Sequence, residues 1–231
     1  MKVKFILSGI FGALFASLIA ALKLFDVSAI GPENTSIGFS KINKAFHDFT
    51  GMNPVCYDIS EILGYAAILV AIAFVIVGLF QLIKRKNPLK ADKEIYFLGG
   101  LYALTLAFYA LFEILIINFR PVIMVGDEHV EASFPSSHTL LSCVILGSTA
   151  ILLYKYIKKR GLRIALQCLC YLSVAATVSC RLICGVHWLT DIVGGVLLSL
   201  ALIFLYWGFL DMISPVKHSF IKSNKKSDTS K

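Results

Sequence analysis

Long apolar segments alternate with short polar connections along most of the chain. A helix needs about 20 apolar residues to cross the hydrocarbon core of a bilayer, and six segments reach about that length. They are residues 5–24, 59–83, 95–119, 139–157, 162–182 and 188–210. The pattern predicts an all-α, polytopic membrane protein, with an integral membrane domain over residues 1–214 and a basic, disordered cytoplasmic tail over residues 215–231.

The composition agrees with this class. The chain has 231 residues, of which 58% are hydrophobic, whereas soluble domains are roughly 45–50% apolar. Six spans leave no room for a separate soluble domain. The basic start, followed by Ala20 and Ala21 after the first apolar run, is also compatible with a cleaved signal peptide, although that run is long for one.

The charge distribution predicts the orientation. The net charge is +8, and 17 of the 22 lysines and arginines lie in alternate connections and at the two ends. This is the positive-inside pattern of a membrane protein, so we expect no nucleic-acid partner. Both termini should be cytoplasmic, and the connections over residues 120–137 and 181–187 should face outside.

The longest outer loop, residues 25–58, contains apolar residues at spacings of two to four, interleaved with basic ones. The apolar set is Ile37, Phe39, Ile42, Phe46 and Phe49, and the basic set is Lys41, Lys44 and His47. Such a segment lies in the headgroup region or packs over the mouth of the bundle. In either position it could border the entrance for a lipid substrate.

Arginine and histidine occur where the apolar segments end, which is an expensive location for ionisable groups. Arg120 and Arg181 carry planar, permanently charged donor groups that suit phosphate oxygens. His138 and His187 can exchange protons near neutral pH. Together these four residues predict a site for phosphate-ester chemistry on the outer side.

Two further features support an anion site. Ser136 and Ser137 precede the fourth predicted helix, where free backbone N–H groups favour anions, although a serine there is also an ordinary N-cap. His187 and Asp191 are four residues apart on the last predicted helix, so the carboxylate can orient the imidazole. An intramembrane aspartate can also be a proton relay or a structural partner.

The order and spacing of these residues resemble the signature of the type 2 phosphatidic acid phosphatase (PAP2) superfamily, in its membrane lipid phosphatase branch. That signature reads lysine, six residues, Arg-Pro; then Pro-Ser-Gly-His; then Ser-Arg, five residues, His, three residues, Asp. The matches here are Arg120-Pro121, Pro135-Ser136-x-His138, and Arg181 with His187 and Asp191. The resemblance implies the helical bundle that this family shares with vanadium haloperoxidases and bacterial class A acid phosphatases.

The resemblance also implies a role for each residue. His187 would attack phosphorus and form a phosphohistidine, and Asp191 would orient it. His138 would protonate the leaving group. Arg120 and Arg181 would hold the phosphoryl oxygens, and the cradle would be completed by Ser136 and the backbone N–H of Ser137. Neither a metal nor another cofactor is expected.

The chain departs from the signature at three positions. Glu113 stands where the lysine is expected, Ser137 replaces glycine, and Cys180 replaces the serine before arginine. We hypothesise that Glu113 orients Arg120 or Arg181, because positions seven apart share a helical face. The missing cation could instead come from elsewhere in the chain, with Lys41, Lys44 and His129 as the candidates.

The expected function is a metal-independent membrane phosphatase of a bacterial type. It would hydrolyse a lipid phosphomonoester or a polyprenyl pyrophosphate at the outer face of the cell membrane, through a phosphohistidine. A phosphotransferase to a lipid or sugar acceptor would use the same residues. A transporter or a noncatalytic binder of anionic lipid is a further alternative. A zinc hydrolase is disfavoured, because arginines beside the histidines oppose a cation.

Overall fold

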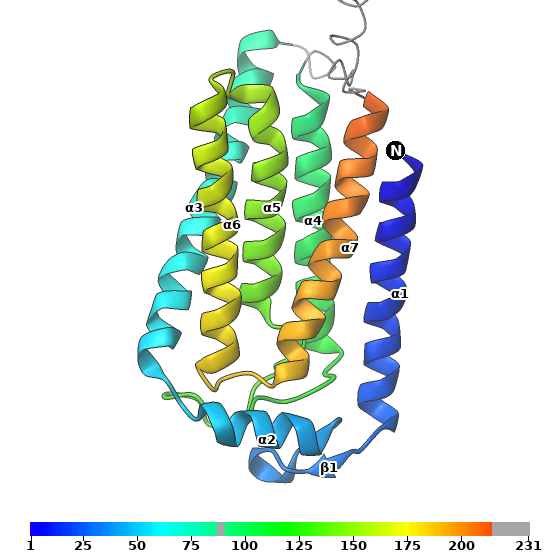
Figure 1. The fold of residues 1–231 in the computed structure, drawn as a ribbon, viewed down its shortest axis with the longest axis vertical. Coiled ribbons are helices and arrows are strands. Elements are labelled where there is room, and N and C mark those ends of the chain that lie inside the picture. Colours follow the sequence, from blue (N-terminus) through cyan, green and yellow to red (C-terminus); the bar gives the residue numbers. More distant parts are fainter. Residues whose placement is uncertain (87–90, 214–231) are drawn as a thin grey trace, which may run out of the picture.

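Six long helices run side by side in the computed structural model, which describes residues 1–86 and 91–213 (Figure 1). They are α1 (Lys2–Leu24), α3 (Pro54–Arg85), α4 (Lys93–Ile114), α5 (Ser137–Tyr156), α6 (Arg160–Ile183) and α7 (Leu189–Ile213). Each is long and apolar enough to cross a membrane. The prediction of an all-α, multi-pass protein is therefore confirmed, while the predicted tail over residues 215–231 lies outside the described residues.

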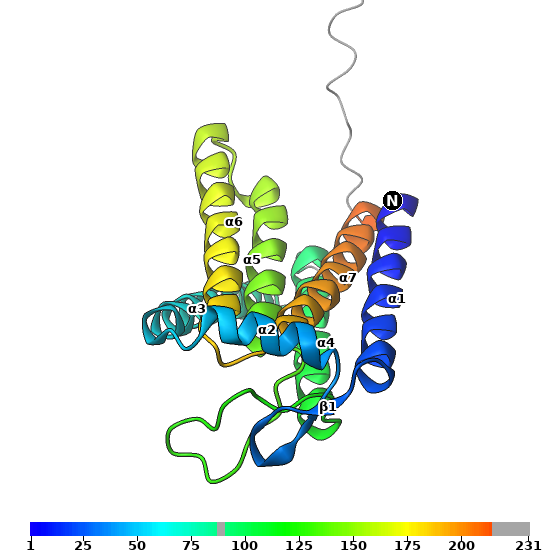
Figure 2. The same ribbon diagram turned by 60° about the horizontal axis from the view of Figure 1, so that its bottom comes forward.

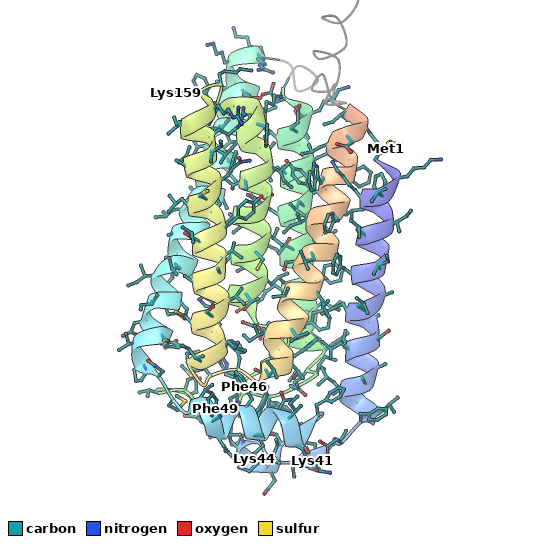
Figure 3. The ribbon with its side chains drawn as sticks, viewed as in Figure 1. Met1, Lys41, Lys44, Phe46, Phe49 and Lys159 are labelled. Atoms are coloured by element: carbon teal, nitrogen blue, oxygen red, sulfur yellow. The ribbon has the colours of Figure 1, made fainter. Side chains whose placement is uncertain are left out.

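The segment between α1 and α3 crosses one end of the bundle. A short antiparallel hairpin pairs β1 (Ser28–Ala29) with β2 (Ser36–Ile37) around a 3-10 turn, η1 (Pro32–Asn34). Helix α2 (Ser40–Thr50) then lies across the helix ends (Figures 1 and 2). Phe46 is on the side of α2 that faces the bundle, and Lys41 and Lys44 point away from it (Figure 3). The predicted amphipathic segment thus packs over the mouth of the bundle.

Asn43 attaches α2 to the start of α7. Its side-chain amide donates to the hydroxyl of Thr190 at 3.0 Å, and its side-chain oxygen accepts from the backbone N–H of Thr190 at 3.2 Å. A first-turn N–H has no partner within its own helix, so Asn43 caps α7 from another element. This contact places α2 directly over the turn that leads into α7.

Helices α5 and α7 form the centre of the bundle and are its most buried helices. Phe15, Phe112 and Phe134 pack against one another in the core, with ring centroids 5.6–6.0 Å apart. Phe134 precedes α5 in the chain, so this aromatic cluster anchors the segment that carries the serine and histidine motif. The outward faces of α1, α3 and α6 expose apolar side chains, as expected for helices in contact with lipid.

Helix α4 ends at Ile114, five residues before the predicted end. After the C-cap residue Leu115, the Lys23 ammonium binds two carbonyl oxygens, at 3.3 Å for Ile116 and 2.9 Å for Ile117. The sequence stays apolar to Phe119, but the backbone no longer follows the helix. This break removes the premise that Glu113 and Arg120 share a helical face.

Candidate active site

A buried row of hydrogen-bonded side chains lies at the end of the bundle covered by α2. It consists of His187, Ser133 and Asp191. The Nδ1 atom of His187 is 3.0 Å from the Ser133 hydroxyl, which donates to Asp191 Oδ2 at 2.5 Å. The direct distance from His187 Nδ1 to Asp191 Oδ2 is 3.9 Å, longer than a hydrogen bond. The expected aspartate-to-histidine contact therefore passes through a serine.

Asp191 accepts two further hydrogen bonds, one from the loop after α4 and one from its own turn. The Asn118 side-chain amide donates to Oδ1 at 3.1 Å, and the Trp188 backbone N–H donates to Oδ2 at 2.9 Å. The carboxylate is fully buried, and buried carboxylates require such partners. Asp191 thus joins the loop after α4, the segment before α5 and the first turn of α7.

Arg181, His138 and Glu61 form a second cluster. The Glu61 carboxylate pairs with the Arg181 guanidinium and lies 3.2 Å from His138 Nε2. Arg181 is 1% exposed, so its charge needs this counterion. Gly64, one helical turn after Glu61, allows the close approach, because a Cβ there would lie 2.7 Å from the His138 ring.

Arg120 lies in the loop between α4 and α5. Its backbone N–H donates to the Glu131 carbonyl at 3.0 Å, and its Nε lies 3.3 Å from the Glu131 carboxylate. The loop is also held from the hairpin side, where Glu33 accepts from His129 and from the Val130 N–H. The bond with His129 is the main cause that lowers the pKa of Glu33.

Ser136 and Ser137 begin α5, as predicted. Ser136 is the N-cap residue, yet its side chain makes no capping hydrogen bond. Within the described part of the chain its buried hydroxyl has no hydrogen-bond partner. The ordinary N-cap interpretation therefore does not account for this serine.

A small cavity of about 20 Å³ lies beside part of this set. Arg120, Ser137 and His187 line it together with Tyr109 and Glu113. Its volume is about that of one water-sized probe. The space between Arg120 and His187 is thus too small for a phosphate group in this conformation.

The structure does not support the orienting role expected for Glu113. Glu131 is the counterion of Arg120 and Glu61 is that of Arg181, while among the described residues no ion pair reaches Glu113. The physical reason is the end of α4, which leaves Glu113 on the last helical turn and Arg120 in a loop. Glu113 instead interacts with Tyr109 and borders the cavity.

The alternative sources of a third cation have other positions. Lys44 pairs with Asp48 on the exposed side of α2, and His129 pairs with Glu33. Lys41 is exposed and points away from the bundle (Figure 3). The structure thus brings two arginines to the site, and these three residues lie elsewhere.

Burial lowers the pKa of His187 well below its usual value, and the charges of Arg120 and Arg181 lower it further. The imidazole is therefore neutral near pH 7. Its Nε2 atom is buried and has no hydrogen-bond partner among the described residues. One ring nitrogen is fixed by Ser133, and the other remains free for chemistry.

Sequence reasoning missed Glu61, Ser133 and Asn118. Glu61 carries a usable signal, because an ionisable residue near the start of an apolar span is expensive and marks a candidate functional position. Ser133 and Asn118 are common loop residues with no distinguishing spacing. Only the fold brings them to Asp191.

The fold defines a class: a membrane protein with six candidate spans, which carries buried arginine and histidine side chains at one end of the bundle. The comparisons with known proteins show a family resemblance over part of the chain. Residues 103–214 match the family model of the PAP2 superfamily, and this range contains all the signature residues. This part of the chain is thus similar to the PAP2 superfamily, as the motifs predicted.

A solved structure supports the fold over nearly the whole chain. It is that of a transmembrane PAP2-type phosphatidylglycerolphosphate phosphatase from Bacillus subtilis, with a TM-score of 0.66 and 18% sequence identity. The similarity covers 91% of this chain and 99% of the other. The protein therefore has a PAP2-type membrane phosphatase fold. No curated protein sequence gave a match.

Proposed function

We propose that the protein is a membrane phosphatase that hydrolyses a lipid phosphate by way of a phosphohistidine on His187. The observation that carries this proposal is a set of buried polar atoms without hydrogen-bond partners among the described residues: Ser136 Oγ, His187 Nε2 and Arg181 Nε. Leaving such atoms unpaired costs about 1–3 kcal/mol each. A phosphoryl group supplies acceptor oxygens for the donors and an electrophile for the imidazole.

In the first step the lone pair of His187 Nε2 attacks phosphorus, a P–N bond forms and the bond from phosphorus to the leaving oxygen breaks. His138 gives its proton to that oxygen. Arg120 and Arg181 stabilise the charge on the remaining phosphoryl oxygens. Ser136 and the backbone N–H of Ser137, at the positive end of α5, complete the cradle.

In the second step water attacks the phosphohistidine. The P–N bond breaks, His138 accepts the proton from water, and phosphate leaves. No step needs a group beyond these side chains and water. Within the described residues, no group of three or more histidine, cysteine or acidic side chains is arranged to hold a metal ion.

Glu61 competes with the substrate for Arg181 in this account. Its carboxylate already pairs with the Arg181 guanidinium and contacts His138. For Arg181 to hold a phosphoryl oxygen, the pair between Glu61 and Arg181 has to loosen. A phosphoryl oxygen then replaces the Glu61 carboxylate beside the buried Arg181 guanidinium, so the guanidinium keeps an anionic partner. Separately, the cavity of about 20 Å³ beside Arg120 and His187 has to widen to admit a phosphate group.

The substrate class is a lipid phosphomonoester or pyrophosphate. The site lies where helices with lipid-exposed apolar faces end, beneath the amphipathic helix α2. The protein of similar fold is a phosphatidylglycerolphosphate phosphatase, which makes a lipid phosphomonoester the first substrate to test. Glu113 beside the cavity disfavours additional negative charge, and this also favours a monoester over a pyrophosphate.

The test is a panel of lipid phosphates presented to the purified protein in detergent. Phosphatidylglycerolphosphate, phosphatidate and a polyprenyl pyrophosphate would each be assayed with the wild type and with His187→Ala. We expect the wild type to release inorganic phosphate from at least one lipid, and the variant to be at least about 1,000-fold slower. Phosphate found only on an added acceptor would indicate a phosphotransferase, and tight binding without release would indicate a noncatalytic binder.

The site faces outside in this proposal, and both termini are cytoplasmic. The support is the segregation of charge: basic residues gather where α1 starts, where α3 ends and around the turn from α5 to α6. These places share the end of the bundle opposite to α2 (Figures 1 and 3). Positively charged ends stay in the cytoplasm.

A further inference from the structure

Ser133 occupies the position between the proposed nucleophile and its carboxylate. It is 3% exposed, it lies 3.0 Å from His187 Nδ1, and its hydroxyl donates to Asp191 at 2.5 Å. Asp191 itself remains 3.9 Å from the imidazole. Any influence of the carboxylate on the histidine through hydrogen bonds therefore passes through this hydroxyl.

The donors around Asp191 fix the direction of the hydrogen bonds that run from His187 through Ser133 to Asp191. Asp191 already accepts from Asn118 and from the Trp188 N–H, and an ionised carboxylate can only accept. A contact of 2.5 Å between two oxygen lone pairs would be repulsive, so the Ser133 hydrogen lies between the two oxygens. The Ser133 oxygen then has only lone pairs to offer to His187.

This direction selects one tautomer of His187. Nδ1 must carry the hydrogen in order to donate to Ser133, and Nε2 then holds the lone pair. The opposite tautomer would place a hydrogen on Nε2, which would block its attack on phosphorus. Neutral histidine otherwise populates both tautomers. The two hydrogen bonds therefore exclude the Nε2–H tautomer of His187, which cannot attack phosphorus.

We propose that Ser133 is a positioning residue that transmits the negative charge of Asp191 to His187 and holds it in the Nδ1–H tautomer. The inference rests on the proposed function, because it concerns the nucleophile of that reaction. When Nε2 forms its bond to phosphorus and the leaving oxygen departs, the ring becomes positively charged. The chain from Nδ1–H through the Ser133 hydroxyl to Asp191 stabilises that charge, and no proton has to move along it.

The first test compares Ser133→Ala with Ser133→Thr on a lipid phosphate that the wild type hydrolyses. Alanine removes the hydroxyl, so we expect kcat to fall about 10- to 100-fold, the range for losing a hydrogen bond to a charged group, with KM nearly unchanged. Threonine keeps the hydroxyl and should recover most of the rate. The matched control is Ser148→Ala, which removes another buried, hydrogen-bonded hydroxyl of the bundle and should leave kcat unchanged.

The second test does not depend on activity. Nitrogen NMR of ¹⁵N-histidine-labelled protein distinguishes a protonated from an unprotonated ring nitrogen, and the His187 signals are assigned by their loss in His187→Gln. The wild type should show a single Nδ1–H tautomer, and Ser133→Ala should show a mixture. If Ser133→Ala does not fold, the wild-type spectrum and the Ser133→Thr rate decide.

The outcomes separate the two proposals. Wild-type kcat in Ser133→Ala, an equal loss in the alanine and threonine variants, or an Nε2–H tautomer in the wild type would overturn the role of Ser133. A wild type that releases phosphate from no lipid would overturn the proposed function instead. In that case the tautomer measurement would still test Ser133.

Discussion

At the scale of single residues, burial and charge act on His187 in the same direction. Both lower its pKa in the folded protein, whereas an unfolded histidine titrates near 6.5. The folded state thus binds fewer protons than the unfolded state between that value and the lower folded pKa. Stability from this residue is complete above about pH 6.5 and is lost as the pH falls toward the folded pKa.

This linkage predicts a pH-dependent loss of stability that His187 causes. The apparent Tm of the wild type should fall as the pH is lowered from about 7 to 5. In His187→Gln, which cannot ionise, the fall should be smaller. Thermal unfolding of the two proteins in the same detergent measures the difference. Parallel curves would show that burial of His187 does not resist its protonation.

Residue-scale prediction from the sequence relied on side chains with one dominant chemistry. Arg120, Arg181, His138 and His187 were selected because ionisable groups at the ends of apolar spans are expensive, and the structure gathers all four. Sequence reasoning assigned the counterion of the arginines to Glu113, but Glu61 and Glu131 take that position. The choice among acidic residues depends on how α3 and the loop after α4 approach the site, which local spacing does not record.

At the scale of elements, the turn from α6 to α7 is constrained by its backbone angle and by its neighbours. Gly185 adopts a φ of +79°, and a Cβ there would meet the Gly51 carbonyl and Met52. The same turn is held by His47, which lies 3.1 Å from the Gly185 carbonyl, and by the Asn53 N–H, which donates to the Cys184 carbonyl. His187 follows two residues later, so its position depends on α2 and the start of α3.

Gly185→Ala should therefore displace His187. The positive φ costs about 1–2 kcal/mol for a residue with a Cβ, and the steric contact adds to this, so we expect kcat to fall about 10-fold or more while the helix content stays. Gly126→Ala is the matched control, because Gly126 has a φ of +101° but open space around its Cβ position. Circular dichroism and phosphatase assays compare the two. Equal effects would show that backbone strain alone matters.

The apolar pattern predicted the existence of each span better than the residue at which it ends. All six spans were recognised, because about 20 apolar residues leave little alternative in a bilayer. The end of α4 was misplaced, because the residues after Ile114 remain apolar while Lys23 and Asp191 bind groups of that segment. Such long-range hydrogen bonds terminate a helix without any signal in its own sequence.

At the scale of the whole molecule, charge segregation and site location predict one orientation. A cysteine introduced at the fully exposed Val125, in the loop beside the site, should react with a membrane-impermeant maleimide in intact cells. A cysteine at Arg160, at the opposite end, should react only after permeabilisation. Wild-type labelling gives the background from the native cysteines. The reverse pattern of labelling would place the site in the cytoplasm.

The fold of the whole molecule was predictable as a class because membrane length, charge asymmetry and the motif order all constrain it. The pairing of Glu61 with Arg181 and His138 was not predictable. It joins residues of three different helices. Contacts of that kind arise from packing and have no local sequence pattern.

The most direct test of the central claim is detection of the phosphorylated enzyme. The wild type would be mixed with a ³²P-labelled lipid phosphate that it hydrolyses, quenched within milliseconds in alkaline detergent and analysed for protein-bound label. The account predicts label that survives alkali, is lost in acid and is absent from His187→Gln. Continued phosphate release without labelled protein, or label that persists in His187→Gln, would contradict attack by His187.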